Sequence, residues 1–253
     1  MYSPNKKLGQ NFLVDHTVIR KMIDSLGLND NEKIVEIGSG LGILTEDLAS
    51  RLLGLTYRVY AVEIDERFVP KLENMFTFNP NVFVVHADIL NWLPEFKTEE
   101  DFKILGSLPF YITSPILHLI IKMPKQAETC VLLVQKEVAQ KITNQAPDTS
   151  YLSAFIQTFY DVNYIDTVSK TSFKPQPQVD GAILQFKKNS VRHTLEFINE
   201  YEQFLHQGFK HPRKMLNKAF SKQELQKGAI DPNLRPQVLS AAQWLQFFKV
   251  LKS

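Results

Sequence analysis

The chain has 253 residues, of which 44% are hydrophobic, and a formal net charge of +2 at pH 7. A chain of this length and apolar content can bury one large core, or one core with a small second domain. Its single cysteine excludes an internal disulfide. The six histidines lack the spacing of metal ligands, so we expect no metal, and no apolar run is long enough to span a membrane.

Taken in chain order, the first predicted element is an amphipathic helix over Asp15–Leu26, which Gly27 ends. Alternating strand and helix patterns continue to about residue 187, and they predict a mostly parallel sheet with helices on both faces. The predicted strands are 33–38, 58–64, 82–87, 102–108, 129–135, 162–169 and 180–187. Little more than a proline-rich loop separates the last two strands, so we expect them to pair as an antiparallel hairpin.

A glycine turn follows the first of these strands. Lys33–Ile37 is a β-branched run, the sequence Gly-Ser-Gly-Leu-Gly occupies 38–42, and 43–53 has apolar residues at helical spacing. The glycines permit a tight turn and leave room for a ligand beside the backbone. Their spacing differs from the G-x-G-x-x-G of dinucleotide sites. It is compatible with a nucleoside that carries an amino-acid tail.

Acidic residues close the next two predicted strands. Glu63 ends the second strand, where a carboxylate can accept hydrogen bonds from both ribose hydroxyls, and Asp88 follows the third, where it can accept from an adenine amine. Each acid alone is more often a helix cap or a solvated loop residue. Together with the glycine turn, they lie at the carboxyl ends of successive strands, where open α/β sheets bind ligands. The combination predicts a site for S-adenosylmethionine.

The segment Gly106–Tyr111 follows a buried apolar run and has the sequence Gly-Ser-Leu-Pro-Phe-Tyr. Ser107 and nearby backbone carbonyls can accept hydrogen bonds from an exocyclic amine, Pro109 fixes the backbone, and Phe110 can stack on a base. By itself the segment is also an ordinary exit from a strand into a loop. The cofactor site upstream favours the interpretation in which it holds a target base.

The strand patterns stop near residue 188, and helical patterns follow over 197–209, 214–220 and 238–251. Residues 188–253 contain 11 Lys or Arg and 5 Asp or Glu, whereas the rest of the chain has a net negative charge. Such a run of charge usually means a solvated helical surface; we favour a surface that binds RNA phosphates. Four basic residues recur near helical spacing, so several can share one face: Lys210, Arg213, Lys214 and Lys218.

These motifs occur in order along nearly the whole chain, which resembles the ribosomal RNA adenine dimethyltransferase family (KsgA-type enzymes and their relatives). The N-terminal segment Lys6–Leu13 resembles the family segment that closes over the cofactor, and Gly106–Pro115 resembles the catalytic motif. The other matching segments are 36–42, 62–65, 86–88, 135–139, 173–182 and 212–217.

The resemblance implies an α/β fold with the Rossmann-like sheet of S-adenosylmethionine-dependent methyltransferases and a small C-terminal all-helical domain. It implies a cofactor-binding catalytic domain over 1–187 and a helical RNA-binding domain over 188–253. The implied cofactor residues are Gln10, Asn11, Leu13, Gly38, Gly40, Glu63, Asp88 and Ser107, and the implied catalytic residues are Ser107, Leu108, Pro109 and Phe110. Family members usually have asparagine where this chain has Ser107, a departure that bears on rate and on substrate placement.

The activity that the resemblance implies is methyl transfer from S-adenosylmethionine to N6 of two adjacent adenines near the 3′ end of small-subunit ribosomal RNA. The expected partner is the immature small ribosomal subunit, and we expect a monomeric, cytoplasmic protein. Two alternatives stay open. One is methylation of a large-subunit adenine, as in antibiotic-resistance relatives, although Arg213-Lys214 and Asp231–Pro236 are more similar to the small-subunit branch. The other is a catalytically weak rRNA-binding assembly factor, which Ser107 keeps open.

Overall fold

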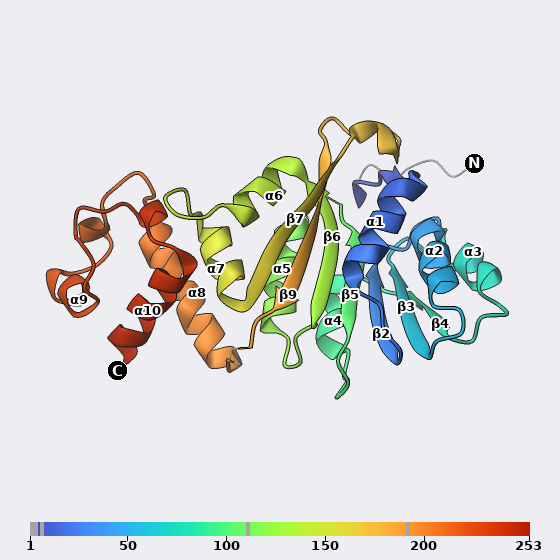
Figure 1. Ribbon diagram of the computed structural model, residues 1–253, viewed down its shortest axis with the longest axis horizontal. Coiled ribbons are helices and arrows are strands. Elements are labelled where there is room, and N and C mark those ends of the chain that lie inside the picture. The colour runs from blue at the N-terminus through green and yellow to red at the C-terminus, as the bar shows by residue number, and fades with distance from the viewer. Residues whose placement is uncertain (1–4, 6–7, 110–111, 191–192) are drawn as a thin grey trace. The chain divides into compact units, whose positions relative to one another are not determined.

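The computed structural model of the chain describes residues 5, 8–109, 112–190 and 193–253 (Figure 1). Seven described strands form one sheet in the order β4-β3-β2-β5-β6-β9-β7. The first five in the chain run parallel, and β9 is antiparallel to β6. Their bounds are β2 Glu32–Ile37, β3 Tyr57–Glu63, β4 Val82–His86, β5 Lys103–Ser107, β6 Thr129–Gln135, β7 Tyr160–Val168 and β9 Gly181–Lys188. All seven predicted strands are present, and the last two are neighbours in the sheet.

Helices cover the sheet, as the alternating pattern predicts. They are α1 His16–Leu26, α2 Ile43–Arg51, α3 Val69–Met75, α4 Ile89–Glu95, α5 Thr113–Lys122 and α6 Lys136–Thr143. Helix α1 packs on β5, β6 and β9, whereas α4 and α5 pack on each other; Figure 1 shows α1 in front of the strands and α4 and α5 behind them. In the described chain, no helix is both long enough and apolar enough to cross a membrane.

Helix α1 shows how local sequence sets these boundaries. The side chain of Asp15 accepts a hydrogen bond from the backbone N–H of Thr17 at 2.9 Å and caps the first turn. Gly27 ends the helix in the left-handed conformation, with a φ of 64°. The buried face consists of Ile19, Met22, Ile23 and Leu26, which recur at helical spacing.

A second, two-stranded sheet was not predicted. Strand β1, Phe12–Leu13, pairs antiparallel with β8, Phe173–Lys174, and so ties the N-terminal motif to the loop that precedes β9. The N–H of Val14 also donates to the carbonyl of Ser172 at 2.9 Å. Strands of two residues have no measurable alternation, so sequence periodicity could not reveal this pairing.

The described residues divide into two compact units. The first comprises 1–139 and 163–188 and contains nearly all of the large sheet. The second comprises 140–162 and 189–253. A boundary after residue 187 was predicted, and the segment 140–162 departs from it: its helix α7, Tyr151–Phe159, packs on α8 and α10. The hydroxyl of Thr158 in α7 lies 3.0 Å from that of Tyr201 in α8.

The second unit has an aromatic core. Besides α7 it contains α8 Leu195–Phe209, α9 Lys222–Lys227 and α10 Ala241–Lys252. Rings from α8, α10 and the loop between them pack edge-on or tilted around Trp244, which is fully buried. The helix predicted over 214–220 is wrong: only a single 3-10 turn, Leu216–Lys218, forms there. Backbone bonds from Leu216 to Leu234 and from Asn217 to Pro232 hold this segment as a loop instead.

Candidate active site

A cavity of about 200 Å³ lies at the carboxyl ends of the central strands. The consecutive residues 8–12 form part of its wall, together with the ends of β2, β3 and β5 and the loop after β4. The structure brings most of the predicted site residues to this wall: Gln10, Asn11, Gly38, Gly40, Glu63, Asp88, Ser107, Leu108 and Pro109. Leu13 does not line this cavity. Its side chain is buried in the core and lines a smaller cavity of about 60 Å³, which shares Asn11, Phe12, Gly38, Gly40 and Ser107 with the first.

The glycine turn has the backbone that glycine alone adopts at no steric cost. Gly38 has a φ of 75°, and a Cβ placed on it would meet no described atom within 4 Å, so open space adjoins the backbone beside the cavity. Gly42 has a φ of 83°, and a Cβ there would lie 2.9 Å from the side chain of Leu72. Gly38 therefore leaves room for a ligand, and Gly42 lets the backbone before α2 approach Leu72 of α3 closely.

Glu63 is the last residue of β3, and its buried carboxylate is held by two backbone groups. Its Oε2 accepts from the N–H of Gly40 at 2.7 Å, and its Oε1 accepts from the N–H of Asp65 at 2.8 Å. Burial raises the pKa of Glu63, and these two hydrogen bonds act in the opposite direction. Each carboxylate oxygen can accept a further hydrogen bond from a ligand in the cavity.

Glu36, in β2, is an acid that the sequence analysis did not assign to the site. It is fully buried, lines the smaller cavity, and neither carboxylate oxygen has a hydrogen-bond partner among the described residues. The buried hydroxyls of Ser39 and Thr45 likewise lack described partners. Burial, with a contribution from nearby Glu63, raises the pKa of Glu36 to about 7. A carboxylate between the apolar residues Val35 and Ile37, two positions before the glycine turn, was the signal available in the sequence.

Asp88 is a helix cap, as one of its two interpretations predicts, and the adenine contact stays a prediction. Its side chain caps α4 by accepting from the N–H of Leu90 at 2.9 Å, and the residue also lines the larger cavity. Capping occupies Oδ1, which leaves the other oxygen as an acceptor for a ligand amine.

The segment predicted to be catalytic continues β5 into the cavity wall. Ser107 is the last residue of β5 and lines both cavities. The N–H of Leu108 donates to the carbonyl of Leu133 at 3.0 Å, and the carbonyl of Pro109 accepts from the N–H of Ile112 at 3.2 Å. These two bonds anchor the segment at Leu108 and at Pro109. Phe110 lies outside the described residues.

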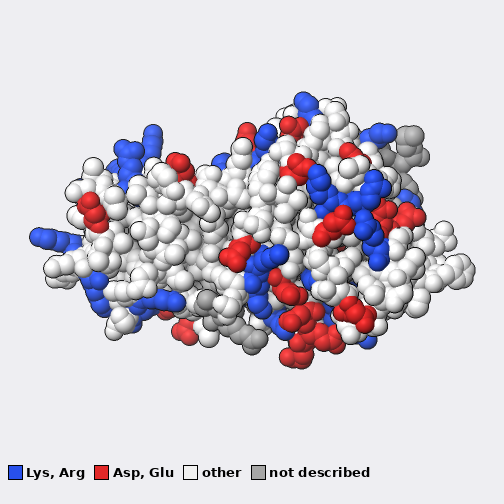
Figure 2. Space-filling view, in the orientation of Figure 1, with Lys and Arg blue, Asp and Glu red and all other residues white. Residues whose placement is uncertain are grey.

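The four predicted phosphate-binding residues are exposed but do not share a helical face. Lys210 follows the end of α8, Arg213 and Lys214 lie in the loop after it, and Lys218 lies in the 3-10 turn. The prediction of one face is therefore wrong, because Pro212 cannot continue the helix. Figure 2 shows basic side chains projecting from the C-terminal end of the molecule, with fewer acidic ones among them.

Comparisons with known proteins give the chain a family. The family model described as ribosomal RNA adenine dimethylase matches residues 1–253. A ribosomal RNA small subunit methyltransferase A from Sulfurihydrogenibium sp. is 34% identical over 257 residues, which cover 99% of this chain and 97% of the relative. The protein of the same name from Enterococcus faecalis is 32% identical, with coverage of 99% and 91%.

Solved structures agree with the fold. The 23S rRNA methyltransferase ErmE superposes with a TM-score of 0.76 at 25% identity and covers 96% of this chain and 100% of its own. A dimethyladenosine transferase from Plasmodium falciparum gives a TM-score of 0.78 at 20% identity, with coverage of 95% and 98%. With its sheet, its glycine turn and its acids at successive strand ends, the chain belongs to the ribosomal RNA adenine dimethylase family.

Proposed function

We propose that this protein transfers methyl groups from S-adenosylmethionine to N6 of two adjacent adenines near the 3′ end of small-subunit ribosomal RNA, within the immature subunit. The observation that carries the proposal is the cavity at the strand ends, which Glu63, Asp88 and the Ser107–Pro109 segment line together. The names of the relatives support the small subunit as the target.

The residues around the two cavities suit this cofactor. Glu63 would accept hydrogen bonds from the ribose hydroxyls, since its carboxylate is already oriented by two backbone N–H groups. Asp88 would accept from the adenine amine. Glu36, which lacks a described partner in the smaller cavity, would neutralise the amino group of the amino-acid tail. When bound, S-adenosylmethionine supplies a methyl group on a positively charged sulfur.

The protein's chemical task is to aim a weak nucleophile. The lone pair of the adenine N6 amine is delocalised into the ring, and hydrogen-bond acceptors on the N–H groups localise it. The hydroxyl of Ser107 and the carbonyl of Leu108 are placed at the strand end to act as those acceptors, and the sequence assigns stacking on the base to Phe110. Positioning and electrostatics then account for most of the rate, and no strong base is required. The target base has to leave its helix or loop to enter the site.

Removal of the Glu63 carboxylate tests the cofactor assignment. In Glu63→Ala, the dissociation constant for S-adenosylmethionine should rise roughly 10- to 100-fold, because charge-assisted hydrogen bonds to the ribose are lost. Isothermal titration measures this directly. Glu66→Ala, at an exposed position three residues away, is the matched control and should bind normally. An unchanged constant in Glu63→Ala would remove this residue from the cofactor site.

Ser107→Ala tests the catalytic assignment. We expect methyl transfer to slow by at least about tenfold while the cofactor affinity changes little, since one acceptor for the amine is lost. Single-turnover rates with labelled cofactor give the comparison, and Ser50→Ala, at an exposed position in α2, is the control. Full activity in Ser107→Ala would show that the Ser107 hydroxyl takes no part in catalysis.

Ser107→Asn tests the residue that family members usually have at this position. A higher rate of methyl transfer would show that serine limits the reaction. A lower rate would show that the site is built around the shorter side chain.

The choice of substrate is tested with unmethylated small and large ribosomal subunits offered separately, followed by mass spectrometry of the RNA nucleosides. Dimethyladenosine in the small subunit alone supports the proposal. Label in the large subunit would support the resistance-type alternative. Cofactor binding without transfer to either subunit would favour an assembly factor.

For the RNA contact we propose the exposed basic residues of the C-terminal unit, around Arg213 and Lys214.

A further inference from the structure

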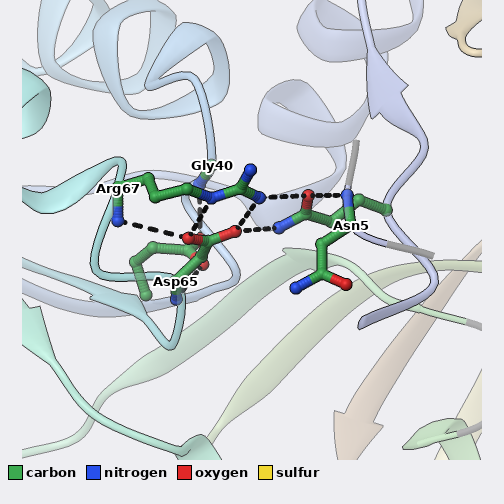
Figure 3. Close-up of polar contacts among 6 residues, drawn as sticks. Asn5, Gly40, Asp65 and Arg67 are labelled. Atoms are coloured by element: carbon green, nitrogen blue, oxygen red, sulfur yellow. Dashed lines mark hydrogen bonds and ion pairs between the residues drawn. The ribbon is translucent and has the colours of Figure 1, made fainter. Parts of the chain in front are cut away.

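Three side chains beside the cavity form a closed ring of hydrogen bonds (Figure 3). Gln10 Nε2 donates to Asp65 Oδ2 at 2.7 Å. Arg67 donates to both carboxylate oxygens of Asp65, from Nη2 at 2.5 Å and from Nε at 2.8 Å. The same Nη2 lies 3.4 Å from Gln10 Oε1, which closes the ring. We call this set the Gln10–Asp65–Arg67 ring.

The ring connects the N-terminal segment to Glu63, the proposed ribose acceptor. The N–H of Asp65 donates to Glu63 Oε1. Asp65, which binds both other members of the ring, is therefore bonded directly to the predicted ribose acceptor. On the other side, Gln10 Oε1 accepts from the N–H of Asn5 at 2.7 Å, and residues 8–12 form the adjoining cavity wall. The amide of Gln10 is therefore turned to Asp65, which can only accept, and to Arg67.

Packing holds the same segment at a second point. The ring of Phe12 meets that of Phe68 edge-on, with centroids 5.5 Å apart, and the guanidinium of Arg67 lies 5.6 Å from the centroid of Phe68. Phe68 is fully buried, so it provides a fixed base. The side chain of Asp65 is only 5% exposed, whereas that of Arg67 is 36% exposed. Arg67 can thus be changed without opening the core.

We propose that Asp65 and Arg67 are positioning residues that act through Gln10 to fasten the segment 8–12 over the bound cofactor. The inference rests on the proposed function for the identity of that cofactor. Gln10 links the segment to this pair. Because Arg67 binds both carboxylate oxygens of Asp65, Asp65 Oδ2 is held in a fixed direction toward the side-chain amide of Gln10. Loosening the ring should let S-adenosylmethionine escape faster while the fold persists.

The test compares Arg67→Ala, Gln10→Ala and their double variant in the full chain. The dissociation rate of S-adenosylmethionine, from stopped-flow competition, should rise by about tenfold in each single variant. The double variant should add little, because the ring is already open. Hydrogen–deuterium exchange of the amides of 8–13 in the ligand-free protein should accelerate more than that of the amides in β5 and β6, which report opening of the core. Arg58→Ala, at an exposed position in β3, is the matched control.

Gln10→Glu is the sharpest variant, since it keeps the shape of Gln10 and places a carboxylate oxygen against Asp65. It should release the cofactor at least as fast as Gln10→Ala. Wild-type exchange of 8–13 in Arg67→Ala, or additive effects in the double variant, would overturn the inference. The exchange measurement needs no ligand. If the unaltered protein failed to bind S-adenosylmethionine, the proposed function would fail while the role of the ring would still be decided.

Discussion

Gly208→Ala should destabilise the C-terminal unit by about 2 kcal/mol or more, although alanine is the better helix former by about 1 kcal/mol. Gly208 lies in α8, and a Cβ there would come within 2.4 Å of Trp244 Cη2 and 2.8 Å of Cζ3. Trp244 cannot retreat, because it is fully buried among aromatic rings and its indole N–H donates to the carbonyl of Pro236 at 3.3 Å. Chemical denaturation of the full chain, followed by circular dichroism, gives the free energy of unfolding and serves equally for variants that lack Trp244.

A double variant identifies the clash as the cause. Trp244→Phe removes ring atoms that the new Cβ would meet, at the cost of its own cavity. In Gly208→Ala combined with Trp244→Phe, the loss of stability should be clearly smaller than the sum of the two single losses. If the two losses of stability simply added, the strain would arise from a contact other than the one between the new Cβ at position 208 and Trp244.

Glu36→Gln should make the ligand-free protein more stable above neutral pH and at the same time weaken cofactor binding. Burial raises the pKa of Glu36 from 4.5 to about 7, so the folded state holds its proton more tightly than the unfolded state does. The contribution of Glu36 to stability is therefore fully present below pH 4.5 and is lost as pH rises through 7. The loss amounts to about 3 kcal/mol, and the glutamine variant should avoid it.

The measurement is the free energy of unfolding from pH 4.5 to 8 for the wild type and Glu36→Gln. The free energy of unfolding of Glu36→Gln should exceed that of the wild type by an amount that grows as the pH rises across this window. Glu63 also titrates with a raised pKa and is coupled to Glu36, so the difference between the two proteins reports Glu36 together with its interaction with Glu63. Glu46→Gln, at an exposed position in α2, should follow the wild type. Parallel curves would show that Glu36 is ionised throughout, and unaltered cofactor affinity would remove it from the site.

Much of the architecture could be predicted from local sequence. Most of the seven strands contain a short apolar or β-branched run, and the parallel arrangement of the first five follows from alternation with helices. The rule that ligands bind at the carboxyl ends of parallel strands places Gly38, Glu63, Asp88 and Ser107 together, and all four line the same cavity. These predictions succeed because the period of the pattern and the direction of the strands determine the geometry.

The rest depends on contacts between residues far apart in sequence. The pairing of Phe12–Leu13 with Phe173–Lys174 and the hydrogen bond from Gln10 to Asp65 have no local pattern. The helical spacing over 214–220 is genuine, but backbone bonds to Pro232 and Leu234 outweigh it. Glu36 became a candidate site residue only when the structure showed that it is buried. The sequence alone does not say whether a single charged residue in a strand faces solvent or the interior.

The division of the C-terminal unit into 140–162 and 189–253 has a consequence for the order in which the chain is synthesised. The sheet can be completed when β9 emerges, at residue 188. Helix α7 has already emerged at that stage, yet Tyr201, which packs against Phe159, is still inside the ribosome. The nascent protein therefore passes through a stage with a finished sheet and an uncovered aromatic helix, which is a binding target for chaperones.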